Sequence, residues 1–156
     1  MLYTKATARG NCLQPSRVER IVYEIGKDLY FSYGHRLMNH AGKCKLLHGH
    51  NAKVTIKVAS EYLDQDGMVM DFSDLKTLVK SFLDEQFDHQ MLLHKDDPAV
   101  PVLQSIGEPL RLLDVHPTAE CLAKLIFDHI LENNIRPLEV ILWETESCFA
   151  SYRADP

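Results

Sequence analysis

Long apolar runs and an excess of basic residues are both missing from this sequence. In 156 residues, no apolar stretch approaches the roughly 18 residues that a membrane-spanning helix requires. The N-terminal residues Met1–Gly10 lack the apolar centre of a signal peptide. The net charge of −5 argues against a general surface for nucleic acid. We therefore expect neither a membrane protein nor a nucleic-acid-binding protein.

Cysteine is also scarce. The four cysteines are Cys12, Cys44, Cys121 and Cys148. They do not look like the disulfide framework of a secreted protein, so we expect free thiols and a cytoplasmic location. A hydrophobic content of 46% and a charged content of 25% are those of a globular protein with its own core. Residues 1–17 are polar without a period and predict an N-terminal extension, followed by a single domain over residues 18–156.

Four segments are typical of β-strands. The first combines Ile21–Ile25 with Leu29–Ser32, and Gly26 between them predicts an interruption or a bulge. The second, from about His48 to Glu61, has the alternation of a half-buried strand. Two further strands, joined by a tight connection, are predicted at residues 138–143 and 148–152.

Two segments have the period of amphipathic helices. The first follows a cap at Asp71 or Ser73 and carries apolar residues at helical spacing: Leu75, Leu78, Val79, Phe82 and Leu83. The second begins after a cap at Thr118 and ends at Asn133–Asn134. Residues 91–116 between them are irregular, and a connection of this length is usually functional or contains short structure of its own.

The order of these elements, β-β-α-α-β-β, predicts an α+β fold. Sequential strand pairs with both helices grouped between them favour a four-stranded antiparallel sheet with two helices on one face. A small open sheet of this kind has two exposed edges, which must be covered or paired.

Three histidines near the first two predicted strands form a candidate metal site. His48 and His50 are two residues apart at a strand start, so both imidazoles project from one face. His35 closes the first strand, and antiparallel pairing would bring it to the same point. Three imidazoles make a zinc site with an open fourth position, as catalytic zinc requires. Cys44 precedes His48 by four residues. Three roles are open to it: a fourth metal ligand, a thiolate base beside the metal, or a small buried residue.

Three other positions carry groups suited to proton transfer or to recognition. Asp88 and His89 follow the first helix and form either a carboxylate-oriented imidazole or a polar pair at a helix end. Glu144 ends a strand, where its carboxylate can accept two parallel hydrogen bonds or remain solvated. Basic residues near the histidines are compatible with an anionic small substrate: Arg36, Lys43, Lys45 and Lys53.

In this order, the sequence resembles the 6-pyruvoyl-tetrahydropterin synthase family, most of all its 6-carboxy-tetrahydropterin synthase branch, which serves queuosine biosynthesis. The resemblance runs from about residue 20 to residue 153. It is carried by His35, Cys44-x-x-x-His48-Gly-His50, Gly67–Phe72, Asp88-His89, Pro117–Glu120 and Trp143–Thr145. The interval of four residues between Cys44 and His48 is that of the carboxy-forming branch.

The resemblance implies a complete set of expectations. The fold would be the T-fold, whose subunits join their sheets into a β-barrel and form a homohexamer, a dimer of trimers. The substrate would be 7,8-dihydroneopterin triphosphate, converted to 6-carboxy-5,6,7,8-tetrahydropterin with release of acetaldehyde and triphosphate. Zinc would be held by His35, His48 and His50.

The resemblance also implies roles for the remaining candidates. Cys44 would transfer protons, assisted by Asp88 and His89 from a neighbouring subunit. Glu144 would anchor the pterin ring, with Thr118 as a second contact. Ala119 departs from members that carry a second threonine there. The alternatives are a pyruvoyl-forming triphosphate lyase on the same site, and a non-catalytic module with structural zinc or a bound pterin.

Overall fold

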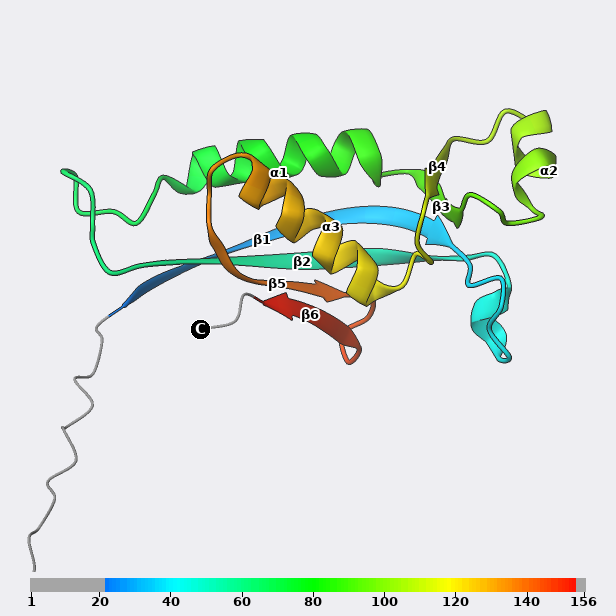
Figure 1. Cartoon of the computed structure of the whole chain (residues 1–156), viewed down its shortest axis with the longest axis horizontal. Helices are drawn as coiled ribbons and strands as arrows, with labels where there is room; N and C mark the ends of the chain where they lie inside the picture. Colours follow the sequence, from blue (N-terminus) through cyan, green and yellow to red (C-terminus); the bar gives the residue numbers. More distant parts are fainter. Residues whose placement is uncertain (1–21, 154–156) are drawn as a thin grey trace, which may run out of the picture.

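The computed structural model describes residues 22–153, so the predicted extension at residues 1–17 lies outside the described residues (Figure 1). The elements in this range are β1 (Tyr23–His35), the short 3-10 helix η1 (Lys43–Lys45), β2 (His48–Ser60), α1 (Phe72–Gln86), β3 (Gln90–His94), α2 (Val100–Ser105), β4 (Leu110–Leu113), α3 (Ala119–Glu132), β5 (Pro137–Trp143) and β6 (Phe149–Arg153). Within residues 22–153, no helix is long and apolar enough to cross a membrane.

All six strands belong to one sheet, in the order β4-β3-β1-β2-β5-β6. The β1–β2, β2–β5 and β5–β6 pairs are antiparallel, whereas β3 pairs in parallel with both β1 and β4. The predicted four-stranded antiparallel sheet is therefore wrong, because the α+β fold contains a mixed sheet of six strands. The two missed strands have only five and four residues, too few to establish an alternating period in a segment with several prolines.

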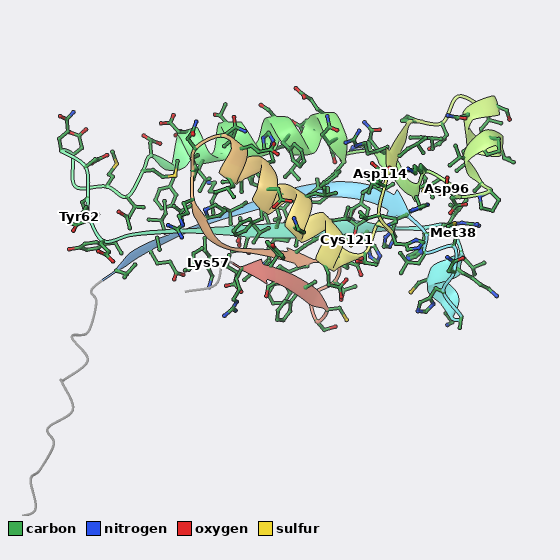
Figure 2. The ribbon with its side chains drawn as sticks, in the orientation of Figure 1. Met38, Lys57, Tyr62, Asp96, Asp114 and Cys121 are labelled. Atoms are coloured by element: carbon green, nitrogen blue, oxygen red, sulfur yellow. The ribbon has the colours of Figure 1, made fainter. Side chains whose placement is uncertain are left out.

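β1 and β2 form a long hairpin that sets the geometry of the histidines. The pairing runs without a break through all 13 residues of each strand and ends with His35 opposite His48. The interruption predicted near Gly26 is wrong, because this residue keeps regular register with its partner strand. Figure 2 labels Met38 beyond the histidine end of the hairpin and Tyr62 beyond the opposite end.

One face of the sheet packs against α1 and α3 and makes the core (Figure 1). Alternate residues of β1 and β2 are buried there, among them Leu29, Phe31, Tyr33, Ala52, Val54 and Ile56. The helices contribute Leu75, Val79 and Leu83 from α1 and Leu122, Ile126 and Ile130 from α3. Because all of these side chains share one cluster, both helices cover the same face, as predicted.

Both helices begin at predicted caps. The Asp71 carboxylate accepts a hydrogen bond from the Ser73 N–H at 2.6 Å, and the Thr118 hydroxyl oxygen accepts one from the Cys121 N–H at 3.3 Å. The C-terminal cap of α3 is Asn133, where the sequence predicts the end of this helix. The start of α3 lies close to the end of β1, because the carbonyl oxygen of Pro117, just before the helix, is 2.7 Å from Nδ1 of His35.

The opposite face of the sheet is polar and contains its own ion pairs. Lys57 lies 3.3 Å from Glu139, and Arg153 lies 2.7 Å from the same carboxylate. Lys53 lies over the ring of Trp143, 4.8 Å from its centroid. The sheet therefore separates a helix-covered apolar face, which carries the histidines, from a polar face with paired charges.

Candidate metal centre

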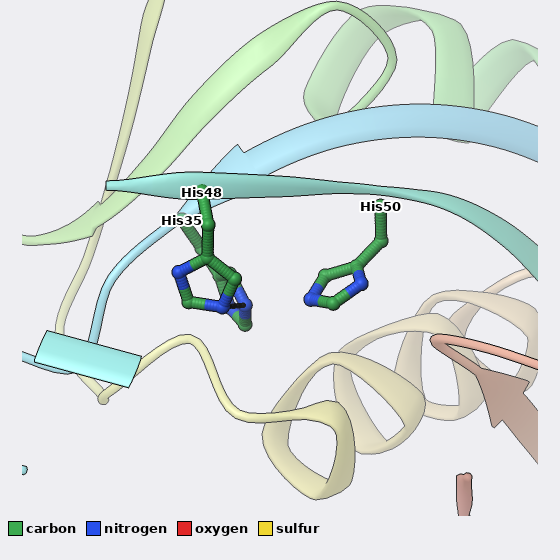
Figure 3. Close-up of side chains that lie close together, drawn as sticks. All are labelled: His35, His48 and His50. Atoms are coloured by element: carbon green, nitrogen blue, oxygen red, sulfur yellow. Dashed lines mark hydrogen bonds between the residues drawn. The ribbon is translucent and has the colours of Figure 1, made fainter. Parts of the chain in front are cut away.

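Three histidines meet at the end of the β1–β2 hairpin (Figure 3). His35 is the last residue of β1, His48 is the first residue of β2, and the antiparallel register sets them opposite each other. His50 lies two residues farther along β2 and projects to the same face. One ligand nitrogen of each histidine lies within 4.8 Å of the other two, so the three side chains could hold one metal ion.

The glycine between the two β2 histidines allows the strands to come close together. An ideal Cβ at Gly49 would lie 2.9 Å from the carbonyl oxygen of Tyr33, closer than Cβ atoms normally approach. A larger residue would therefore push β2 away from β1 and separate His48 and His50 from His35.

Backbone carbonyls determine how two of the rings present their nitrogens. The Nδ1 atom of His35 lies 2.7 Å from the carbonyl oxygen of Pro117, and that of His48 lies 2.7 Å from the carbonyl oxygen of Leu46. Because a carbonyl can only accept, each Nδ1 carries the proton and each Nε2 presents a lone pair. The two Nε2 atoms are 3.0 Å apart, where lone pairs repel unless a proton or a cation lies between them. Carbonyl partners of this kind orient histidines at metal sites.

His50 provides an independent test of whether a metal fits. Its Nε2 atom is buried and has no hydrogen-bond partner among the described residues. An unpaired buried nitrogen is costly in free energy, and a metal ion at the meeting point of the three rings would satisfy it. Burial lowers the pKa of His35 and outweighs the Pro117 carbonyl and Glu144, which act to raise it. This favours the neutral imidazole, the form that binds metals.

Glu144, the residue after β5, lies beside the histidines. Its Oε1 atom is 3.8 Å from Nε2 of His35 and 3.9 Å from Nε2 of His50. The hydroxyl of Tyr33 donates a hydrogen bond to the same Oε1 atom at 2.9 Å. Burial raises the pKa of Tyr33 above its ordinary value, and Glu144 raises it further, so the hydroxyl stays protonated. Sequence patterns did not single out Tyr33, although strand alternation places it on the face of His35.

A cavity of about 340 Å³ at this point brings together more of the predicted residues. Its lining includes the three histidines, Glu144, Cys44 and Thr118. Cys44 belongs to η1, which is tied to the end of β1 because the Leu37 N–H donates to the Cys44 carbonyl oxygen at 2.8 Å. Among the described residues, the group of ligand atoms within 4.8 Å of one another contains the three histidines and not the Cys44 thiol. Cys44 therefore faces the same cavity from outside the histidine cluster.

Asp88 and His89 occupy a different place. They follow α1, where Asp88 accepts a hydrogen bond from the Ser32 N–H at 2.8 Å and lies 3.0 Å from Nδ1 of His89. His89 has a φ of 55°, which is uncommon for a residue other than glycine, and its side chain is 82% exposed. It lines a second cavity, of about 510 Å³, that also reaches His48 and His50. Within one chain, the pair is thus not part of the 340 Å³ cavity.

The segment at residues 91–116, which contains most of β3 together with α2 and β4, is anchored beside the histidines. Asp97 is 2% exposed and accepts a hydrogen bond from Nε of Arg36 at 2.8 Å. Its second oxygen accepts from the Ala99 N–H at 2.8 Å. Because Arg36 follows His35 directly, this ion pair, in which the carboxylate is buried and the guanidinium partly exposed, ties the segment to the end of β1. The sequence did not predict the pair, since its members are 61 residues apart.

A family model and several known proteins, among them the three described next, are similar to this chain. The family model, described as 6-pyruvoyl tetrahydropterin synthase, matches residues 24–155. A 6-carboxy-5,6,7,8-tetrahydropterin synthase from Rickettsia conorii is 35% identical over an alignment of 126 residues, and the match covers 76% of this chain and 91% of the relative. One from Bacillus subtilis is 32% identical over an alignment of 138 residues, and the match covers 84% of this chain and 85% of the relative.

The third protein is known from a solved structure. It is an uncharacterized protein from Wolinella succinogenes, with a TM-score of 0.72 and 26% identity. The superposition covers 86% of this chain and 99% of that one. The range matched by the family model contains all three histidines and Glu144, so the likeness extends over the whole candidate site.

Proposed function

This chain belongs to the 6-pyruvoyl tetrahydropterin synthase family, and we propose that it is a zinc-dependent carbon–carbon lyase acting on 7,8-dihydroneopterin triphosphate. The products are 6-carboxy-5,6,7,8-tetrahydropterin, acetaldehyde and triphosphate, and the reaction serves queuosine biosynthesis. The relatives from R. conorii and B. subtilis, both named 6-carboxy-5,6,7,8-tetrahydropterin synthase, support this choice. The observation that carries the proposal is the convergence of three histidines beside the Glu144 carboxylate in one cavity.

The proposed metal ligands are His35, His48 and His50. Three imidazoles with an open fourth position are a ligand set of catalytic zinc. When bound, zinc supplies a Lewis acid that acidifies the hydroxyl groups of a substrate side chain. The carbonyl oxygens of Pro117 and Leu46 hold the rings of His35 and His48 in the orientation that this role requires.

Glu144 and Thr118 are the proposed contacts for the pterin ring. A carboxylate can accept two parallel hydrogen bonds, from the amino group of a pterin and from its adjacent ring N–H. The oxygen of the Thr118 hydroxyl accepts from the Cys121 N–H, which leaves the hydroxyl proton available to a ligand. Ala119 lines the same cavity and adds no further hydroxyl.

Cys44 is the proposed proton acceptor. Its position in the cavity, outside the histidine cluster, suits a thiolate that takes a proton from the substrate without closing the metal site. A thiol bound directly to zinc would instead complete a four-ligand structural site.

Asp88 and His89 are proposed to act in the site of a neighbouring subunit. The exposure of His89 and its place outside the 340 Å³ cavity favour this arrangement. The sheet ends in β4 on one side and β6 on the other, and these edges offer backbone groups for pairing between subunits. A homohexamer, built as a dimer of trimers around joined sheets, is part of the proposal. Residues 18–156 form its single domain, and the cytoplasm is its location.

A second candidate is the pyruvoyl-forming triphosphate lyase on the same substrate. The description of the matching family model favours it, whereas the four-residue interval between Cys44 and His48 favours the carboxy-forming reaction. A non-catalytic module with structural zinc requires Cys44 as a ligand, and its thiol lies outside the described ligand cluster.

Purified zinc-loaded protein incubated with 7,8-dihydroneopterin triphosphate tests the proposal. Mass spectrometry should detect 6-carboxy-5,6,7,8-tetrahydropterin and acetaldehyde. A 6-pyruvoyl product without acetaldehyde would establish the second candidate instead. Tight pterin binding without any turnover would mean that the chain is a pterin-binding relative.

A further inference from the structure

Glu144 lies almost close enough to the histidines to become a metal ligand itself. In a tetrahedral zinc site with bonds of about 2.0–2.1 Å, neighbouring ligand atoms are roughly 3.3 Å apart. The Oε1 atom of Glu144 is 3.8 Å and 3.9 Å from the Nε2 atoms of His35 and His50. A shift of roughly half an ångström would bring this oxygen into the ligand shell. The carboxylate would then occupy the open fourth position, and the pterin would lose its anchor.

Tyr33 provides a hydrogen bond that opposes this shift. Its hydroxyl donates to Oε1 of Glu144 at 2.9 Å. The ring itself is held firmly, because Tyr33 is only 3% exposed. It stacks on the ring of Phe31, with 5.5 Å between the ring centroids, and meets the ring of His35 edge-on, with 5.2 Å between the centroids. A buried ring on the central strand of the sheet cannot follow the carboxylate, so its hydroxyl marks a fixed point for Oε1.

No other donor in the described part of the chain takes the place of Tyr33. Within residues 22–153, the Tyr33 hydroxyl donates the hydrogen bond to this carboxylate, whereas the nearby Nε2 atoms of His35 and His50 are 3.8 Å and 3.9 Å away, too far for a hydrogen bond. The backbone of Glu144 is held separately, since its N–H donates to the carbonyl oxygen of Cys148 at 3.0 Å. Backbone pairing therefore holds the main chain of Glu144, and the Tyr33 hydroxyl holds its carboxylate.

We propose that Tyr33 is a positioning residue that keeps the Glu144 carboxylate beside the metal and not on it. The hydroxyl uses one lone pair of Oε1, so the other lone pair of Oε1 and the second oxygen remain available to the two pterin donors. Tyr33 thereby preserves both the open fourth position and the recognition of the ligand. This inference rests on the proposed function, from which it takes the metal and the pterin contact of Glu144.

Replacement of Tyr33 by phenylalanine tests the inference, because it removes the donor and keeps the ring. Co²⁺ serves as the probe, since its visible absorption bands change with the number and identity of its ligands. In Tyr33→Phe, we expect shifted Co²⁺ bands and release of Co²⁺ to a chelator that is at least about tenfold slower, because Glu144 becomes a fourth ligand.

Two variants isolate the carboxylate from other effects. The double variant Tyr33→Phe/Glu144→Gln should return the Co²⁺ bands and release rate to wild-type values, because no carboxylate remains to bind the ion. Tyr23→Phe, which removes a hydroxyl at the exposed far end of the same strand, should match wild type. Zinc-loaded Tyr33→Phe should also bind the pterin more weakly, in line with loss of the anchor.

The outcomes separate this inference from the proposed function. Unchanged bands and release in Tyr33→Phe overturn the role of Tyr33, whether or not the wild type forms product. A shift that persists in the double variant also overturns it, because the new ligand would not be Glu144. Failure of the wild type to form product, together with the expected shift in Tyr33→Phe, overturns the lyase assignment and leaves the role of Tyr33 standing. Absence of Co²⁺ bands in the wild type overturns both.

Discussion

Two groups of titratable side chains contact β1, namely the histidine cluster and the Asp88–His89 pair. They differ in how much of their surroundings is provided by the same chain. At the histidine cluster, His35 is 3% exposed and its Nδ1 atom is held by the Pro117 carbonyl oxygen. At the Asp88–His89 pair, the carboxylate is anchored to the Ser32 N–H, but the imidazole is 82% exposed. The first group is surrounded by its own chain, whereas the second faces solvent.

The difference indicates which group can act without a partner. Side chains held by backbone groups are ordered before a ligand arrives, so binding costs them little conformational entropy. An exposed imidazole must be ordered by whatever it meets. We infer that the three histidines bind their metal within one chain, whereas His89 acquires its role from a second surface.

Removal of the histidine ligands is expected to have the largest effect. Wild type should contain about one zinc ion per chain. The His48→Ala/His50→Ala variant should contain almost none and should have no measurable turnover, because one imidazole cannot hold the ion. Elemental analysis by mass spectrometry measures the metal content. His89→Ala is the matched control and should keep its zinc, and stoichiometric zinc in the double variant would mean that the ligands lie elsewhere.

Mixing of two inactive variants tests whether His89 acts in the site of a neighbouring subunit. Cys44→Ala and His89→Ala are each expected to be inactive, but subunit exchange should restore activity if the two residues meet across an interface. Random mixing in equal amounts leaves roughly a quarter of the sites with both residues intact. Native mass spectrometry with one isotope-labelled variant establishes the exchange. Activity that stays at background despite exchange would place both residues in the same subunit's site.

Glu144 allows the recognition of the ligand to be separated from the metal. Glu144→Gln keeps shape and volume but places an NH₂ group against a ligand donor. We expect pterin binding at least about tenfold weaker, which corresponds to roughly 1.4 kcal/mol. Zinc content and melting temperature should stay near wild type, because the amide is neither a metal ligand nor part of the core.

Glu146→Gln is the control for this measurement, since Glu146 is exposed two residues farther along. Isothermal titration with the pterin compares the two variants. If Glu144→Gln binds as tightly as wild type and Glu146→Gln does not, the wrong glutamate has been assigned as the anchor.

The histidine cluster could be predicted because it depends on local periods. Alternation along β2 places His48 and His50 on one face, and a single antiparallel pairing adds His35. The caps of α1 and α3 were equally accessible, since Asp71 and Thr118 bind backbone N–H groups within the next three residues.

The remaining features depend on contacts between distant parts of the chain. The Tyr33–Glu144 hydrogen bond joins residues 111 positions apart, and the Arg36–Asp97 pair joins residues 61 positions apart. β3 and β4 owe their strand conformation to pairing beside β1, not to a pattern of their own. Tertiary pairing of this kind overrides weak local preference, and a single sequence does not contain the partner information.

The smallest expected effect is on the free energy of unfolding and concerns Asp88, whose carboxylate contacts Ser32 of β1 and the imidazole of His89. Burial acts to raise the pKa of Asp88, but the Ser32 N–H, His89 and Lys80 outweigh it and hold the pKa below the ordinary 3.8. A lowered folded pKa means that the carboxylate stabilises the fold above the unfolded pKa, and that this stabilisation is lost as pH falls through the folded pKa. At pH 7, Asp88→Asn should lower the free energy of unfolding by roughly 1 kcal/mol, because the charged hydrogen bond is partly screened by solvent. Urea unfolding of wild type and Asp88→Asn, at pH 7 and at successively lower pH below 4, measures the difference in the free energy of unfolding, which should shrink as the pH falls. A difference that stays constant would mean that the charge of Asp88 does not stabilise its contacts with Ser32 and His89.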